Sequence, residues 1–283
     1  MKKNEKNQIF SYVISAYIIS WLFWIIAFLL GYDDPSFINL INWQFENQQE
    51  MTAFIVFRLG IYGPLIASVA VTYNYYGRQG LKLLWKGIIS WRVGIKWYLY
   101  LFLIPLCINL IVLAIGLIMG IPSASFFNSD LSLTLILFLF LYQIFTSGLE
   151  EPGWRGFLLN KLQKKYTAKK ASWLLGLIWA IWHYPYVIFL YYSGGVMGTA
   201  FSLAGFTMAI IGQTFIFTFI YNNTGSILMA ILLHAWLNTS ATIILGDITI
   251  TNPIMGIIPA LVTWGVVFVL LKKYGGERLV NNS

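Results

Sequence analysis

Long apolar runs recur along the whole chain and restrict the folds that are open to it. Eight can be delimited, at residues 9–30, 52–73, 97–119, 131–149, 171–192, 200–221, 226–245 and 254–271. Each is close to the ~20 residues that a helix rising 1.5 Å per residue needs to cross ~30 Å of hydrocarbon. Only 10% of the residues are charged, whereas soluble domains carry about 25%. The sequence therefore predicts an all-α polytopic integral membrane protein with about eight transmembrane helices, in a single transmembrane domain over residues 1–283.

The start of the chain is basic, as in a signal peptide, but the apolar run that follows is too long and has no small-residue cleavage site. We expect it to be the first membrane helix. In the resulting topology, 17 of the 18 Lys and Arg residues fall on one side, and the loops of the other side carry only acidic charges. The positive-inside rule then predicts a multi-pass cell-membrane protein with both termini cytoplasmic. The net charge of +8 needs no nucleic-acid partner to explain it.

One basic segment has a different character. Residues 80–97 mix Lys and Arg with three tryptophans. This pattern is typical of an amphipathic helix that lies in the membrane interface, and we expect one there, before the third span.

The most unusual polar stretch is GLEEPGWRGF, at the cytoplasmic end of the fourth span. Glu151 and Arg155 are four residues apart, so on a helix they would form an ion pair. Glu150 has no such partner, which makes it the better candidate for a general base. Pro152 and two flanking glycines disturb the helix here. A simpler interpretation is that both glutamates are solvated residues at a helix end.

Both histidines of the chain lie within predicted spans. His183 is in the fifth span and His234 in the seventh, and both spans start on the side of Glu150. Asn238 follows His234 by four residues and shares its helix face. A single buried histidine is often only a hydrogen-bonded packing residue. An acid, two histidines and an amide in one leaflet instead indicate a functional site, and Pro185 should loosen the helix beside it.

Such a set of side chains suits hydrolysis. A carboxylate and a neutral imidazole can take a proton from water, while a second imidazole and a carboxamide stabilise the oxyanion that forms. Glu150, His183 and His234 also match the His₂Glu ligands of a catalytic zinc, and their spacing leaves both options open. We favour a site without a metal or other cofactor.

Three motifs in this order are similar to those of the CAAX protease and bacteriocin-processing family, also called the CPBP or Abi family. They are E-E-x-x-x-R (Glu150, Glu151, Arg155), aromatic-x-x-x-H (Trp179, His183) and H-x-x-x-N (His234, Asn238). The family comprises intramembrane endopeptidases and includes the Ras-converting CAAX prenyl protease. The resemblance covers roughly residues 140–245, within a motif-bearing half at about 131–245. The second motif usually begins with Phe, and Trp179 keeps an aromatic side chain there.

The resemblance implies a role for each residue. Glu150 and His183 would activate water, His234 and Asn238 would stabilise the oxyanion, and Glu151, Arg155 and Trp179 would support the site. The substrate would be a peptide or membrane protein cut near the cytoplasmic membrane face, where the site opens. The Lys-, Asn- and Ile-rich composition suggests a low-GC bacterium, in whose plasma membrane prenylated CAAX proteins are not expected.

Two other classes of function remain open. One is a scaffold or bacteriocin self-immunity factor that needs no proteolysis, and the more distant one is a proton-coupled transporter, for which the sequence lacks repeated halves. Two further positions are ambiguous. Arg58 either reaches the outer interface or lines the cavity and meets a substrate carboxylate. Glu150 lies shallower than the histidines unless the fourth span is longer or tilted, or a hydrated cavity reaches inward.

Overall fold

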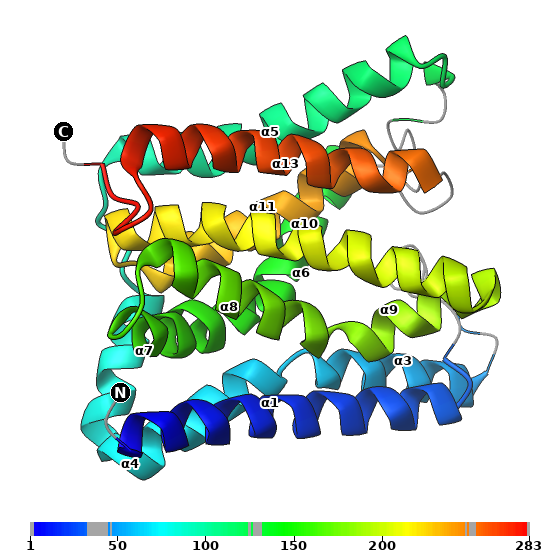
Figure 1. Cartoon of the computed structure of the whole chain (residues 1–283). Coiled ribbons are helices and arrows are strands. Elements are labelled where there is room, and N and C mark those ends of the chain that lie inside the picture. Colours follow the sequence, from blue (N-terminus) through cyan, green and yellow to red (C-terminus); the bar gives the residue numbers. More distant parts are fainter. Residues whose placement is uncertain are drawn as a thin grey trace.

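The computed structural model describes residues 3–32, 45, 47–123, 126, 132–246, 248 and 253–281. The described residues contain no strand, and the chain folds as a bundle of helices (Figure 1). The elements are α1 (Lys3–Leu29), α3 (Gln48–Gly60), α4 (Gly63–Ile88), α5 (Ile95–Ile118), α6 (Leu133–Phe145), η2 (Ser147–Glu150), η3 (Pro152–Leu159), α7 (Asn160–Gln163), α8 (Ala168–Trp182), α9 (Tyr184–Tyr191), η4 (Tyr192–Gly194), α10 (Gly195–Thr224), α11 (Ile227–Ile244) and α13 (Pro253–Tyr274).

Local capping fixes several of these boundaries. The side chains of Ser132, Thr167 and Ser226 each accept a hydrogen bond from the backbone N–H three residues later, at the starts of α6, α8 and α11. Such bonds satisfy amides that have no partner inside the helix. α10 ends at Gly225, whose φ of 62° is left-handed and suits glycine.

Six helical segments of the described chain are long and apolar enough to cross a membrane, or seven when the bent pair α3–α4 is taken as one span. The protein is thus an all-α, multi-pass membrane protein, as predicted. The count differs from eight because the predicted fifth span is broken. α8 ends at Trp182 and α9 begins at Tyr184, with Pro185 in the first turn of α9. The 15 residues of α8 are too few to span a bilayer.

The positions of the chain ends bear on the predicted topology. The start of α1 and the end of α13 lie at the same end (Figure 1), as the prediction that both termini share one side requires. The acidic residues Asp33, Asp34, Glu46, Asp130 and Asp247 of the opposite loops lie outside the described residues. The direction of the bundle in the membrane stays a prediction.

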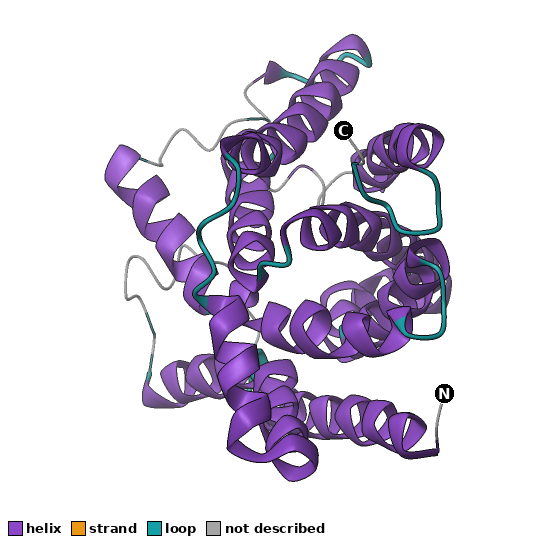
Figure 2. Cartoon of the chain, turned by 90° about the vertical axis from the view of Figure 1, so that its left-hand side faces the viewer, coloured by secondary structure: helices purple, strands orange, loops and turns teal. Residues whose placement is uncertain are grey.

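α4 bends sharply at Gly77, where φ is +59° and ψ is −156°. Beyond this point the helix runs across the end of the bundle that faces the viewer in Figure 2. A helix therefore exists over residues 78–88 of the expected segment, and Leu83 and Trp85 on it are 68% and 52% exposed. Its place in the membrane interface stays a prediction. The predicted extension to residue 97 is wrong, because residues 90–94 are not helical and α5 already begins at Ile95.

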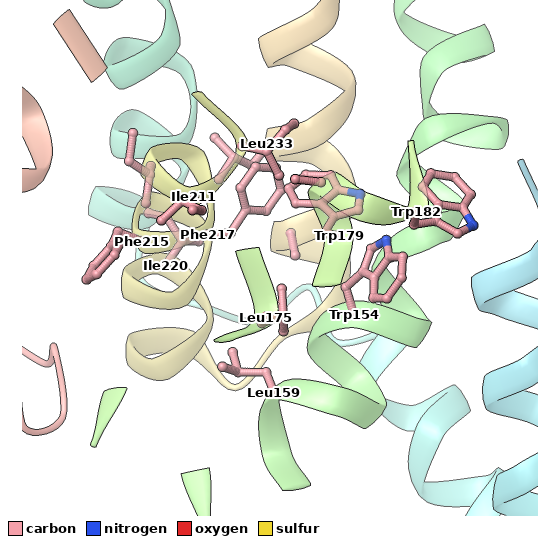
Figure 3. Close-up of a cluster of buried hydrophobic side chains, with 14 of the residues drawn as sticks. Trp154, Leu159, Leu175, Trp179, Trp182, Ile211, Phe215, Phe217, Ile220 and Leu233 are labelled. Carbon is pink, nitrogen blue, oxygen red and sulfur yellow. The ribbon is translucent and has the colours of Figure 1, made fainter. Parts of the chain in front are cut away.

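The centre of the bundle is an aromatic cluster (Figure 3). α8 packs against α10, and α11 against α5 and α6. Trp154, Trp179, Trp182 and Phe217 are at most 1% exposed, and Trp179 lies between Phe217 and Trp154 in the close-up. This cluster surrounds the polar residues described next.

Candidate active site

The backbone that carries the two glutamates is not an ordinary α-helix. After α6 the chain forms the 3-10 turn η2, and Pro152 then opens the π-helix η3. Proline has no N–H to donate, and π-turns are frequent at functional sites. The apolar segment nevertheless continues from Leu133 to Gln163. The apolar helical segment is therefore longer than the predicted fourth span, and the depth of Glu150 in the membrane stays a prediction.

The glycines of this bend allow close helix packing. A Cβ atom on Gly153 would lie 2.4 Å from the Tyr12 hydroxyl and 2.5 Å from the Pro64 carbonyl oxygen, and one on Gly148 would lie 2.9 Å from Ile231 Cγ2. The sequence predicted that these glycines loosen the helix. The structure shows in addition that they let α1, α4 and α11 approach the backbone beside the glutamates.

Glu150 is 3% exposed, and its carboxylate lies beside two indoles. Its Oε2 accepts hydrogen bonds from Trp154 Nε1 at 3.1 Å and Trp179 Nε1 at 2.8 Å. Both donors end on the same oxygen. The second oxygen, Oε1, is thus left for a further partner such as water.

Glu151 is fully buried and has charged neighbours instead. Arg155 Nη1 lies 2.9 Å from each of its carboxylate oxygens, so the predicted i,i+4 ion pair is confirmed. His234 Nδ1 lies 2.9 Å from Glu151 Oε1. The carboxylate only accepts, so Nδ1 donates, and Nε2 of His234 points away from this bond.

Arg155 is held between two aromatic faces. Its guanidinium carbon lies 4.5 Å from the Trp179 ring centroid and 4.1 Å from that of Phe217. Such contacts attract a desolvated cation by ~2 kcal/mol or more. They help to explain how an arginine with no exposed surface is accommodated here.

His183 stands at the break between α8 and α9, and its Nδ1 lies 2.9 Å from the Trp179 carbonyl oxygen. A carbonyl only accepts, so Nδ1 carries the proton and Nε2 keeps a lone pair. The ring packs edge-on against Trp182 and Phe206. His183 is half-buried, unlike His234.

Asn238 lies one turn beyond His234 on α11 and joins a separate polar group. Its Nδ2 is 3.1 Å from Ser147 Oγ and 3.3 Å from Gln143 Oε1, and Ser147 Oγ donates to Gln143 at 2.6 Å. These hydrogen bonds connect Asn238 to the end of α6 and the start of η2, just before Glu150.

Comparisons with known proteins match the part of the chain that carries this site. Residues 132–240, which contain every residue of the site, match the model of the Rce1-like family, the type II CAAX prenyl endopeptidases. The chain is also 32% identical over 95 residues to CAAX prenyl protease 2 of the archaeon Methanococcus maripaludis. That match covers 31% of this chain and 34% of the relative, so the chain spans about a third of the length of the relative it matches.

Trp179 joins the parts of the site. Its indole N–H binds Glu150, its carbonyl accepts from His183, and its ring packs on Arg155 and, at 5.4 Å between centroids, on His234. Glu150, Arg155, His183 and His234 thus all contact one residue, and Glu151 is joined to them through Arg155 and His234.

Several residues of the site were missed by sequence reasoning. Trp154 had a visible signal, because it follows Glu150 by four residues and so shares its helix face. Ser147 precedes Glu150 by three residues and Gln143 precedes it by seven, spacings that place them on the same face of a helix. Phe217 comes from α10, which carries none of the three motifs, and nothing in the sequence pointed to it.

The zinc alternative was also compared with the geometry. The donor set of Glu150, His183 and His234 has the right chemistry, and both histidines use Nδ1 for an oriented bond, as metal-bound histidines do. Within the described ranges, however, no three His, Cys, Asp or Glu side chains lie close enough to hold a metal ion. A site that works without a metal or other cofactor stays a prediction.

Arg58 was assigned either to the outer interface or to the cavity. Its guanidinium carbon lies 4.7 Å from the Phe54 ring centroid and 5.7 Å from that of Tyr142. These contacts place it over aromatic faces of α3 and α6. A substrate contact stays a prediction.

Proposed function

We propose that this chain is an intramembrane endopeptidase that hydrolyses a peptide bond with a water activated by Glu150 and His183. One observation carries the proposal: Trp179 binds Glu150 through its indole N–H and His183 through its carbonyl oxygen. A carboxylate and an imidazole with a free lone pair are thereby anchored to the same residue. The match of residues 132–240 to the CAAX prenyl endopeptidase family supports it.

The chemistry begins with a proton transfer. Glu150 Oε1 takes a proton from the water while His183 Nε2 accepts its second hydrogen as a hydrogen bond. The water oxygen then bonds to the carbonyl carbon of the peptide. The proton on Glu150 passes to the leaving nitrogen as the C–N bond breaks, so that Glu150 is regenerated.

The oxyanion of the intermediate is assigned to His234 and Asn238. For His234 to donate from Nε2 it must be the imidazolium, since Nδ1 already donates to Glu151. Charge balance favours this form. Arg155 with two ionised glutamates leaves one net negative charge in a buried site, and a protonated His234 neutralises it. Asn238 Nδ2 would supply a second N–H by turning from its bonds to Ser147 and Gln143.

Glu151 and Arg155 are positioning residues in this scheme. Their ion pair fixes the orientation of the His234 ring, and neither contacts the reacting atoms. The substrate is a peptide or membrane protein cut near the membrane face predicted to be cytoplasmic, and its non-prenylated character follows from the predicted bacterial origin. Proteolysis is also what separates this proposal from an immunity or scaffold function.

A comparison in cells tests the proposal. Peptide termini released by cells that produce the intact protein are compared with those from cells that produce Glu150→Ala at the same level in the membrane. We expect a set of termini that disappears with Glu150→Ala, His183→Ala and His234→Ala. Identical termini in all strains would overturn the proposal, and retained biological activity of the variants would favour the scaffold or immunity function.

A further inference from the structure

A cavity lies apart from the residues that would contact substrate. It has a volume of about 630 Å³ and is bounded by the part of α4 beyond Gly77, by η3 with α7, and by the turn between α10 and α11. This part of α4 crosses the end of the bundle shown in Figure 2. The cavity therefore opens where the bundle would meet one face of the membrane.

The cavity contains a buried cation. Lys161 is only 9% exposed, and its ammonium donates to the Tyr76 hydroxyl, which in turn donates to Gln8 Oε1 at 2.6 Å. Its Nζ also lies 4.4 Å from the Tyr76 ring centroid and 5.5 Å from that of Phe157. An ammonium has three N–H groups, and among the described residues no carboxylate lies within ion-pair distance of this one. A buried cation without an anion is costly.

Two more lysines face the same space. Lys86 and Lys164 line the cavity, and no Asp or Glu does. Lys164 reaches an acid outside the lining, Glu5, at 3.3 Å, and this exposed pair contributes little. The cavity therefore presents a positive charge that a phosphate group would neutralise.

The remaining walls are apolar. Leu83, Leu84, Phe157 and Ile227 line the cavity beside the lysines, and Leu83 is largely exposed at its outer edge. A ligand that suits both parts has an anionic head and a hydrocarbon tail. The helix that forms the outer wall carries exposed apolar and basic residues, which is typical of helices in the lipid headgroup region.

We propose that this cavity binds an anionic phospholipid, with its phosphate at Lys161 and Lys86 and its acyl chains leaving along Leu83 into the adjacent leaflet. Basic pockets between helices at a membrane face bind such headgroups in general. The proposal does not depend on the proteolytic function.

The test measures lipid retention by the full-length purified protein. The protein is delipidated, incubated with equal amounts of phosphatidylglycerol and phosphatidylcholine, and examined by native mass spectrometry. We expect one phosphatidylglycerol to be retained in preference to phosphatidylcholine. The double variant Lys86→Met/Lys161→Met should weaken this binding about tenfold or more. The matched control Lys82→Met/Lys165→Met removes the same charge outside the cavity lining and should bind as the unchanged protein does.

Three results would overturn the proposal. They are equal retention of the two lipids, equal losses in the test and control variants, and displacement of the lipid by glycerol phosphate at the same concentration, which would indicate a site for a free phosphate compound. Lys86 is exposed, so Lys86→Met alone should fold and show part of the loss. Unchanged binding in that variant would remove Lys86 from the site and the proposal with it.

Discussion

Glu150 and Glu151 are neighbours in the chain, yet their side chains lie in two different environments. Glu150 faces indole N–H groups and has one oxygen left for a further partner. Glu151 faces an arginine and a histidine, and both of its oxygens lie beside the guanidinium. Between the two residues the backbone changes from the 3-10 turn η2 to the π-helix η3. The difference teaches that burial alone does not define a catalytic acid. A carboxylate paired with an arginine and a histidine is part of the framework, and one held by neutral donors keeps its capacity to react.

The largest expected effect comes from the Glu151 region. Arg155→Met should lower the free energy of unfolding by about 3–5 kcal/mol, because it leaves the buried site with a negative charge that the remaining groups do not neutralise. The double variant Arg155→Met/Glu151→Gln should recover much of this loss, since it removes both charges of the ion pair. Thermal denaturation in detergent measures the stability of the single and the double variant, with Lys170→Met as an exposed control. A single variant as stable as the unchanged protein would mean that the ion pair does not support the fold.

Asn238→Ala tests the oxyanion role proposed for this residue of α11. We expect a decrease in kcat of ~10²–10³-fold, as for the loss of one oxyanion donor, with little change in stability. Asn109→Ala is the matched control. Asn109 is buried and donates to Ser240 at 2.9 Å, so its loss should affect stability and leave kcat nearly unchanged. Equal effects of the two variants on kcat would argue against an oxyanion role.

Trp179→Phe tests the hydrogen bond that the Trp179 indole donates to Glu150. The variant keeps an aromatic ring and removes one N–H from the carboxylate, a bond worth ~1.5–3 kcal/mol, so kcat should fall about tenfold to a hundredfold. Trp173→Phe removes a partly exposed indole outside the site and should leave kcat unchanged. An unaffected Trp179→Phe would show that this hydrogen bond does not position Glu150.

The smallest expected effect is that of metal removal. Exhaustive treatment with a chelator should leave kcat unchanged within error, because the proposed reaction uses only side chains and water. Loss of activity that returns on addition of Zn²⁺ would instead assign Glu150, His183 and His234 as metal ligands.

Much of the fold was predictable, because length and hydropathy alone identify membrane helices. The pairing of Glu151 with Arg155 followed from their spacing of four residues, and Pro185 indicated a weak point beside His183. The pairing of Glu151 with His234 spans 83 residues. No local rule predicts it, since it depends on how α11 packs against the bend.

The indole donors show another limit of sequence reasoning. Trp179 was expected to support the site through its aromatic ring, yet its N–H and its carbonyl each bind a site residue. Phe217 is placed by the packing of α10 on α8 and was not predictable from any motif. Side-chain environment thus decides the roles of two adjacent glutamates that the sequence distinguishes only by one ion pair.

The central claim is that Glu150 reacts while Glu151 supports the structure. Glu150→Gln and Glu151→Gln test it most directly when kcat on a cleaved peptide and thermal stability are measured for both purified variants. The account predicts that Glu150→Gln remains as stable as the unchanged protein and loses at least ~10³-fold in kcat. It predicts that Glu151→Gln is destabilised and keeps measurable cleavage. The reverse pattern, an active Glu150→Gln and a stable but inactive Glu151→Gln, would contradict it.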